Sequence, residues 1–265
     1  MTSLSLTLRD TATMLRRDLR HSVRRISMSL SQIGTPVIML LLFDYFYGGA
    51  LGAGVGGVAG GGAYINYLAP GILVMSIGSG CATTAINLCM DMSEGIIARF
   101  RTMAIARTSV LTGQVIGSLI RTLIGVVLVA GIAVLMGFRP STGPVQWLAA
   151  LGVIALLAFG VTWMGVAFGL VGKTPAGANS LSLIFLLLAF TSSAFVRADS
   201  MPAGIRWFAE YQPFTASIDV LRGLLLGTPV SGGTALLAVA WCVALALAGY
   251  LWARGVYARA ATAAA

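Results

Sequence analysis

The segment VQWLAALGVIALLAFGVTWMGVAFGLV, residues 145–171, contains no charged side chain. A helix needs about 20 predominantly apolar residues to cross the hydrocarbon core of a membrane, and this segment exceeds that length. The rest of the chain shares its character, since 58% of the 265 residues are apolar, 9% are charged and the mean hydropathy is +0.92. An ordinary soluble domain carries about 25% charged residues. The composition therefore indicates a membrane protein and leaves no room for a large soluble catalytic domain.

Further apolar stretches lie on both sides of this segment. Together they predict six membrane-spanning helices, at residues 29–47, 67–90, 118–138, 145–171, 178–196 and 234–252. We expect an all-α, polytopic transmembrane domain over residues 29–254. A cytoplasmic segment of residues 1–28 would precede it, and a cytoplasmic tail of residues 255–265 would follow it.

The basic residues indicate the orientation of these spans. Twelve of the 17 Lys and Arg residues fall in segments on one side, four fall on the other side, and Arg121 lies within the third span. Positively charged segments stay in the cytoplasm, so we expect both termini to be cytoplasmic. Because the basic residues lie beside the spans, the net charge of +9 does not point to a nucleic-acid partner.

The N-terminal segment has its own pattern. From Leu8 to Leu30, aliphatic residues recur at helical spacing, with six Arg residues between them. This pattern predicts a basic amphipathic helix that lies on the inner leaflet of the membrane. A solvated tail is the alternative, because charge runs specify structure weakly.

The first and last external connections differ in composition. Residues 48–62 hold nine glycines, which favours a flexible loop, although a glycine at every fourth position would also suit a helix-packing face. Residues 197–233 mix prolines and aromatic residues with a short apolar run at 221–226. That mixture fits a partly re-entrant or interfacial helical hairpin, and it fits an ordinary lipid-facing loop equally well.

The segment DMSEGIIARFRTMAIARTSVLTGQ, residues 91–114, joins the second and third spans on the predicted cytoplasmic side. Ile96, Ile97, Phe100 and either Met103 or Ala104 make one apolar face at helical spacing. A short helix here could insert that face into a groove of a cytosolic partner. A helix that lies on the inner leaflet would show the same spacing.

Two motifs carry a resemblance to a known family. The first is EGIIARFR at residues 94–101, and the second is QPFT at residues 212–215, followed by Asp219 and LRGLLLG at residues 221–227. Both resemble type-2 ABC exporter permeases, in particular the daunorubicin-resistance type of antibiotic-producing actinobacteria. The chain has Gln212 where the family usually has Asn, a change that leaves the proline-centred turn plausible.

The resemblance implies a permease subunit of an ABC exporter in a bacterial cell membrane. Such a subunit pairs with a second permease copy, identical or related, and with two cytosolic ATP-binding subunits. Those partners bind ATP and Mg²⁺, whereas the permease binds no cofactor. It would move an amphipathic small molecule, antibiotic or polyketide-like, or a lipid-linked compound outward. The helix that couples it to the ATPase would contain Glu94, Gly95, Ile96, Ile97, Arg99, Phe100, Arg101 and Met103.

The sequence gives little support for a nucleotide-binding site, a metal site or a catalytic site. AFGLVGKT at residues 167–174 resembles a phosphate-binding loop, but Ala167 replaces the first glycine and a membrane helix precedes the motif. His21 is the only histidine, and the sequence shows no metal-binding spacing and no catalytic triad. We therefore expect neither an enzyme nor a metal site.

Five further residues are candidates for transport or structural roles. Pro213, Asp219 and Arg222 belong to the second family motif. Arg121 would extend to the inner headgroups, and Asp44 would reach the outer headgroups unless it handles substrate or protons. A proton-coupled secondary transporter that works without an ATPase is the alternative function, and Asp44 would then carry the proton.

Overall fold

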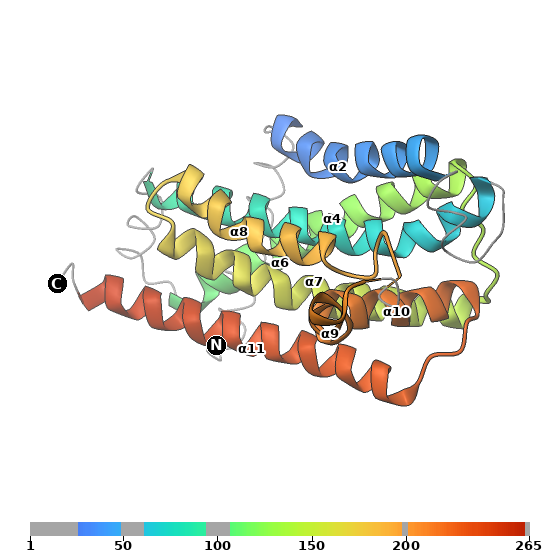
Figure 1. The fold of residues 1–265 in the computed structure, drawn as a ribbon. Coiled ribbons are helices and arrows are strands. Elements are labelled where there is room, and N and C mark those ends of the chain that lie inside the picture. The colour runs from blue at the N-terminus through green and yellow to red at the C-terminus, as the bar shows by residue number, and fades with distance from the viewer. Residues whose placement is uncertain (1–25, 49–60, 94–106, 198–200, 263–265) are drawn as a thin grey trace.

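The computed structural model describes residues 26–48, 61–93, 107–197 and 201–262. Every regular element in these ranges is helical (Figure 1). The order is α2 (Ile26–Leu41), the π-helical turn η1 (Leu42–Phe46), α4 (Gly61–Ser93), α6 (Arg107–Leu135), α7 (Pro144–Val171), α8 (Pro175–Phe190), α9 (Ala203–Tyr211), α10 (Pro213–Leu226) and α11 (Gly232–Thr262). Outside the described residues lie nearly all of the expected N-terminal helix, the coupling segment at 94–103, and residues 49–60 of the glycine-rich loop.

Four helices contain a segment that is long and apolar enough to cross a membrane. These segments are Tyr64–Ser93, Thr112–Leu135, Pro144–Val171 and Gly232–Tyr257. Two shorter apolar helices, Gln32–Phe46 and Pro175–Phe190, lie where the first and fifth spans are predicted. The all-helical, multi-pass character is thereby confirmed, while the count of six spans stays a prediction.

The fifth predicted span is placed differently from the helix that forms there. The side chain of Thr174 accepts a hydrogen bond from Gly177 N at 3.1 Å, so α8 begins earlier, at Pro175. The helix ends at Phe190, because the hydroxyls of Thr191 and Ser192 donate back to carbonyl oxygens of its last turn. Residues 191–196 are then a turn and not, as predicted, the end of a span.

Helix α7 packs against both α4 and α11, and glycines bring these backbones together. A Cβ atom at Gly160 would lie 2.8 Å from the carbonyl oxygen of Cys242 on α11. On the facing side, a Cβ at Gly165 or Gly169 would lie 2.9 or 2.7 Å from a carbonyl oxygen of α4. Small residues at helix contacts are what allows such close packing in a membrane.

The connection at residues 197–233 contains two helices of different character. α10 is buried for most of its length and packs against α4, α7 and α11. α9 is seen end-on in Figure 1, where the long helices run across the page, so it crosses the bundle. It leaves 68% of Trp207 and 45% of Phe208 exposed. The connection is therefore helical, as the first interpretation expects, while its re-entrant or interfacial position in the membrane stays a prediction.

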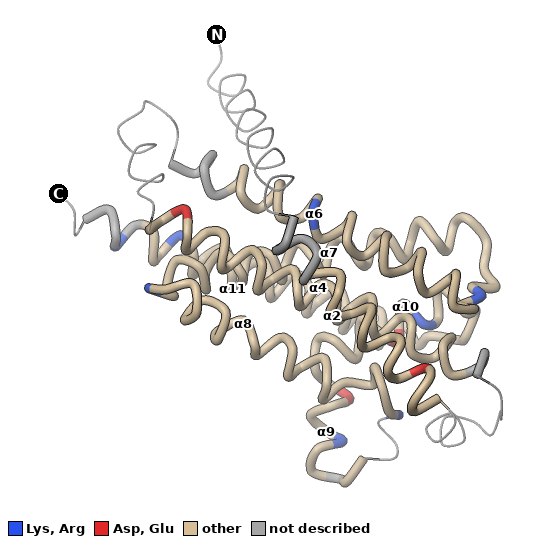
Figure 2. Tube along the Cα trace, turned by 90° about the horizontal axis from the view of Figure 1, so that it is seen from above, with Lys and Arg blue, Asp and Glu red and all other residues tan. Residues whose placement is uncertain are grey.

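Charged residues are rare along the middle of the bundle. In Figure 2 most blue and red positions lie near the two ends, and the long helices between them are largely uncoloured. One pair of charged residues, Asp219 and Arg222, lies at the end of the bundle where α4 begins and α10 ends.

Candidate functional site

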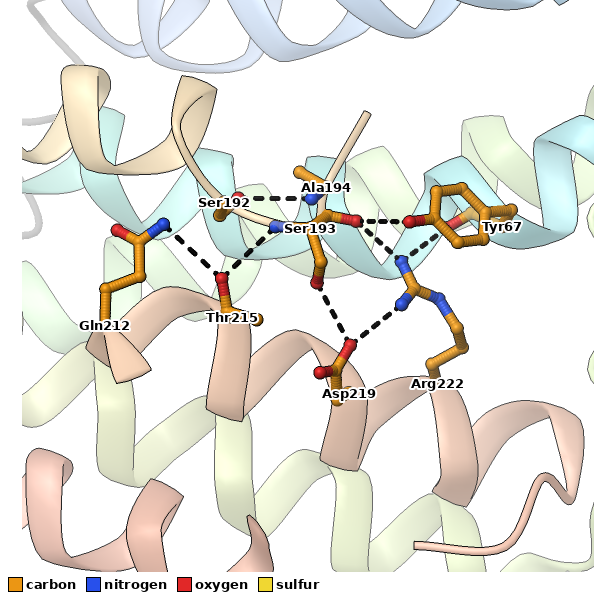
Figure 3. A network of polar contacts seen from close by, with 8 residues as sticks. All are labelled: Tyr67, Ser192, Ser193, Ala194, Gln212, Thr215, Asp219 and Arg222. Atoms are coloured by element: carbon orange, nitrogen blue, oxygen red, sulfur yellow. Dashed lines mark hydrogen bonds and ion pairs between the residues drawn. The ribbon is translucent and has the colours of Figure 1, made fainter. Parts of the chain in front are cut away.

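A polar network joins three elements at this end of the bundle (Figure 3). The first is α4, through Tyr67, the second is the turn at residues 191–196, through Ser193, and the third is α10. α10 contributes Thr215, Asp219 and Arg222, which lie about one helical turn apart on the same side of the helix. The network therefore forms because three segments that are distant in sequence meet.

Asp219 and Arg222 form an ion pair along α10. Arg222 Nη1 donates to Asp219 Oδ1 at 2.9 Å. The Arg222 side chain is only 14% exposed, whereas that of Asp219 is 41% exposed. The Oδ1 atom also accepts a hydrogen bond from Ser193 Oγ at 3.0 Å. Both of these bonds go to this one oxygen, and the other carboxylate oxygen points away from Arg222 in Figure 3.

The guanidinium of Arg222 also ties α10 to α4. Its carbon Cζ lies 3.8 Å from the centroid of the Tyr67 ring, a cation–π contact. Its Nη2 donates to the carbonyl oxygens of Ser193 at 3.0 Å and Tyr67 at 3.3 Å. The planar fork of an arginine can serve several acceptors at once, which the point charge of a lysine cannot. Its Nε has no hydrogen-bond partner among the described residues.

Backbone groups of the turn at residues 191–196 form hydrogen bonds with side chains of α4 and α10. Ser193 N donates to Thr215 Oγ1 at 3.2 Å, and the Ser193 carbonyl oxygen accepts from the Tyr67 hydroxyl at 2.8 Å. A Cβ atom at Gly71 of α4 would lie 2.6 Å from Cβ of Ala194, so this turn touches the α4 backbone. The polar groups of the turn are thereby satisfied away from water.

Burial acts on the acidic member of the pair. It raises the pKa of Asp219 above the ordinary value of 3.8, while the Arg222 charge and the Ser193 hydrogen bond act in the opposite direction. The protonation of Asp219 therefore depends on its burial and on the charges and hydrogen bonds beside it.

The network faces a cavity of about 870 Å³, which we call the polar cleft. α11 forms the opposite wall with Leu236, Leu237 and Ala240. Charged side chains of both signs line it: Arg197, Glu210, Asp219 and Arg222. Two guanidinium groups and two carboxyl groups thus line the cavity, next to an apolar helix face.

The second family motif supplies Thr215, Asp219 and Arg222 to this network, and its first residues stand at the start of α10. Gln212 has extended backbone angles and separates α9 from α10, and Pro213 is the first residue of α10. Proline suits that position because its missing N–H would be unpaired there anyway. The Gln212 side chain makes no helix-capping bond; its Nε2 donates to Thr215 Oγ1 at 3.4 Å. A proline-centred turn is what the sequence predicts here.

The other candidate residues lie elsewhere. Asp44 lies in η1, beside the exposed side chains of Tyr45 and Phe46, and its buried Oδ1 has no hydrogen-bond partner among the described residues. Arg121 donates to Ser118 Oγ of its own helix at 2.8 Å. Neither belongs to the network of Figure 3. The candidate coupling residues lie outside the described residues.

Sequence reasoning missed Tyr67 and Ser193, and it included Thr215 only as the last residue of the QPFT motif. Ser193 was placed inside an apolar span, because Ala194, Phe195 and Val196 extend the hydropathy beyond the true helix end. The run of three hydroxyl residues at 191–193 is the signal that would have found this turn. Tyr67 is distant in sequence and carries no signal of its own.

Cofactor sites are not evident in the part of the chain that the structure describes. No group of three His, Cys, Asp or Glu side chains gathers there in a way that could hold a metal ion. The three cysteines are buried and free. The arrangement can hold helices together and bind charged groups, but it presents no activated nucleophile.

Comparison with known proteins adds a family and two kinds of relative. Residues 9–226 match the sequence model of the family described as ABC-2 type transporter. The chain is 28% identical over 194 residues to the daunorubicin resistance ABC transporter permease protein DrrB1 of Streptomyces coeruleorubidus, covering 73% of this chain and 66% of that protein. It is 28% identical over 152 residues to the probable doxorubicin resistance ABC transporter permease protein DrrC of Mycobacterium tuberculosis, covering 57% and 55%. The match thus spans slightly less than two thirds of the first relative and about half of the second.

Proposed function

This chain belongs to the ABC-2 type transporter family, and we propose that it is the permease subunit of an ABC exporter. The observation that carries the proposal is the family match over residues 9–226, which includes most of the described helices. Four helices long and apolar enough to cross a membrane agree with a permease. The subunit itself would hydrolyse nothing.

The energy for transport would come from two ATP-binding subunits, which hold ATP and Mg²⁺. The coupling segment at 94–103 would dock on them, since its apolar face at Ile96, Ile97 and Phe100 suits a groove of a cytosolic protein. Two permease copies, identical or related, would then rock between inward-open and outward-open states when the ATP-binding subunits close. Both termini would lie in the cytoplasm.

The substrate would be an amphipathic small molecule, antibiotic or polyketide-like, or a lipid-linked compound. The names of the two relatives refer to resistance to daunorubicin and doxorubicin, which supports this class. The largely apolar helices also favour a ligand that enters from the bilayer, because few buried polar groups could replace a shell of water.

Transport into membrane vesicles tests the proposal. Inside-out vesicles from cells that produce the full chain together with its ATP-binding subunit should accumulate daunorubicin when MgATP is added. The control is the same preparation with a non-hydrolysable ATP analogue, which should give no accumulation. Accumulation that is driven by an imposed proton gradient, without ATP and without the second subunit, would instead establish the secondary transporter.

A further inference from the structure

A second cavity lies next to the polar cleft. Its volume is about 710 Å³, and we call it the apolar groove. Side chains from five helices line it, among them Phe168, Leu188, Trp207, Trp241, Leu245 and Trp252. Tyr211, the last residue of α9, lines both cavities. The indole Nε1 of Trp241 donates to the carbonyl oxygen of Tyr211 at 2.8 Å, which fixes the boundary between the cavities.

The two cavities follow one another along α11. The polar cleft uses its first residues, up to Ala240, and the apolar groove uses those from Trp241 to Trp252. At 1.5 Å per residue, the distance from Thr234 to Trp252 is about 27 Å. Half of a bilayer with its headgroups measures about 20 Å. The pair is therefore long enough for one lipid molecule, with its headgroup at one end and an acyl chain at the other.

The polarity changes in the direction that a lipid needs. The apolar groove is lined almost wholly by aromatic and aliphatic side chains, while charged groups line the cleft. α9, which crosses the bundle at the boundary, exposes Trp207 and Phe208. Aromatic residues of this kind concentrate at the membrane–water interface. The boundary between the cavities thus fits the depth at which a headgroup meets its chains.

The polar cleft carries charges of both signs. Arg197 and Arg222 are cationic, Glu210 and Asp219 are acidic, and Glu210 forms an ion pair with Arg206 at 2.6 Å. Guanidinium groups match phosphate well, and both Arg197 and Arg222 line the cleft. The carboxylate oxygen of Asp219 that points away from Arg222 can accept a bond from an ammonium group. A headgroup with both a phosphate and an ammonium group satisfies this arrangement, whereas a purely anionic headgroup would bring no cation to the second carboxylate oxygen of Asp219.

We propose that the polar cleft and the apolar groove together bind one zwitterionic phospholipid of the surrounding bilayer. Its phosphate lies toward Arg197 and Arg222, its ammonium group toward Asp219, and one acyl chain lies along Trp241 and Leu245. This site holds a resident lipid and does not depend on the identity of the exported compound.

Lipid binding to the purified full-length chain tests this proposal. The chain in detergent is titrated with phosphatidylethanolamine or with phosphatidylglycerol, and bound lipid is counted by native mass spectrometry. We expect the first lipid to bind about tenfold more tightly, as one charge-assisted contact would provide. Asp219→Asn should remove this preference, because it keeps the side-chain volume and the acceptor oxygen but loses the negative charge.

The acyl-chain half of the site has a matched pair of variants. Leu245→Trp fills the apolar groove and should weaken binding of both lipids about tenfold or more. Leu247→Trp introduces the same side chain on α11 at a residue that lines neither cavity and should leave binding unchanged. If Leu245→Trp fails to give a monodisperse helical protein, Leu188→Trp on α8 fills the same groove from the other side.

Three results would overturn the proposal. Equal affinity for the two lipids would show that no headgroup is recognised. Unchanged binding to a folded Leu245→Trp variant would assign the lipid to the general surface of the bundle. Displacement of phosphatidylethanolamine by glycerophosphoethanolamine at equal concentration would reduce the site to a headgroup pocket without a chain groove.

Discussion

Tyr67 on α4 and Arg222 on α10 donate hydrogen bonds to the same atom, the carbonyl oxygen of Ser193, at 2.8 and 3.0 Å. The guanidinium also lies over the tyrosine ring. The two residues are 155 positions apart in sequence, so their contact fixes the long-range arrangement of the helices at this end of the bundle. The carbonyl on which they converge belongs to the turn that follows α8.

Arg222→Lys should lower the free energy of unfolding by about 1–3 kcal/mol, because a lysine cannot serve the same set of acceptors. Tyr67→Phe should cost about 1 kcal/mol, since it removes one hydrogen bond and keeps the ring. Denaturant titrations in detergent would measure both, and the double variant should deviate from additivity by about 0.5 kcal/mol or more. Arg206→Lys is the control, because its ion pair with Glu210 is exposed and should contribute little. Strict additivity would contradict a shared network.

The raised pKa of Asp219 predicts that the stability of the folded protein depends on pH. Because burial raises its pKa in the folded protein, the folded state holds the proton more tightly than the unfolded state. The resulting stabilisation is complete below the ordinary pKa of 3.8 and is lost as the pH rises through the raised value. Relative to Asp219→Asn, the wild type should therefore lose stability with rising pH in this window. Thermal unfolding of both proteins between acidic and neutral pH measures the difference, and parallel curves would refute the assignment.

Gly71→Ala should destabilise the fold by about 1–3 kcal/mol, because the added Cβ would lie 2.6 Å from Cβ of Ala194 and force the turn away from α4. Gly131→Ala on α6 is the matched control. A Cβ there meets nothing within 4 Å, so this variant should be neutral or slightly more stable. Denaturation midpoints of the two variants give the comparison. Equal midpoints would mean that the turn moves away from α4 without lowering the stability of the protein.

Gln212→Asn should stabilise the protein by about 0.5–1 kcal/mol. Gln212 precedes α10 with extended backbone angles, but its side chain makes no capping bond to that helix. The shorter side chain of asparagine reaches the free N–H groups of the first turn better than glutamine does. Gln212→Ala, which cannot cap, should bring no gain in the same denaturant titration. A gain in both variants would point to relief of the buried and unpaired Gln212 Oε1.

Phe100→Asp should uncouple ATP hydrolysis from transport, because a charge on the apolar face of the coupling segment would disfavour its insertion into the ATP-binding subunit. Co-purification with that subunit should fall, while the amount of permease in the membrane stays the same. Arg101→Gln offers a comparison in the same segment, because it leaves the apolar face intact. Normal transport by Phe100→Asp would identify this segment as a surface helix only.

The sequence predicts those helices best whose ends carry strong local signals. The predicted span at 145–171 agrees with α7 because Pro144 begins the helix and Gly172 follows its last residue. The end of α8 was misplaced because Phe195 and Val196 are as apolar as the helix before them. Burial of α10 escaped prediction too, since a run of apolar residues at 221–226 is too short to indicate a span.

The candidate site, too, contains residues that the sequence indicated and residues that it did not. Asp219 and Arg222 were found because they stand three residues apart in a family motif, which places them on one helix face. Their partners were not found, because the contacts to Tyr67 and Ser193 depend on how α4 and α10 pack. Those contacts are fixed by the close approach of backbones at glycines such as Gly71, and hydropathy contains no information on that geometry.

The glycines of α7 have a mechanical consequence. Where the backbones lie this close, no layer of deformable side chains separates α7 from α4 and α11. We therefore expect the three helices to move as one rigid unit. α4 alone is about 50 Å long. One of its ends, Ser93, adjoins the segment that we propose to bind the ATP-binding subunit, and the other end carries Tyr67. If the ATP-binding subunit displaces the first end, we expect the displacement to reach the Ser193 turn with little loss.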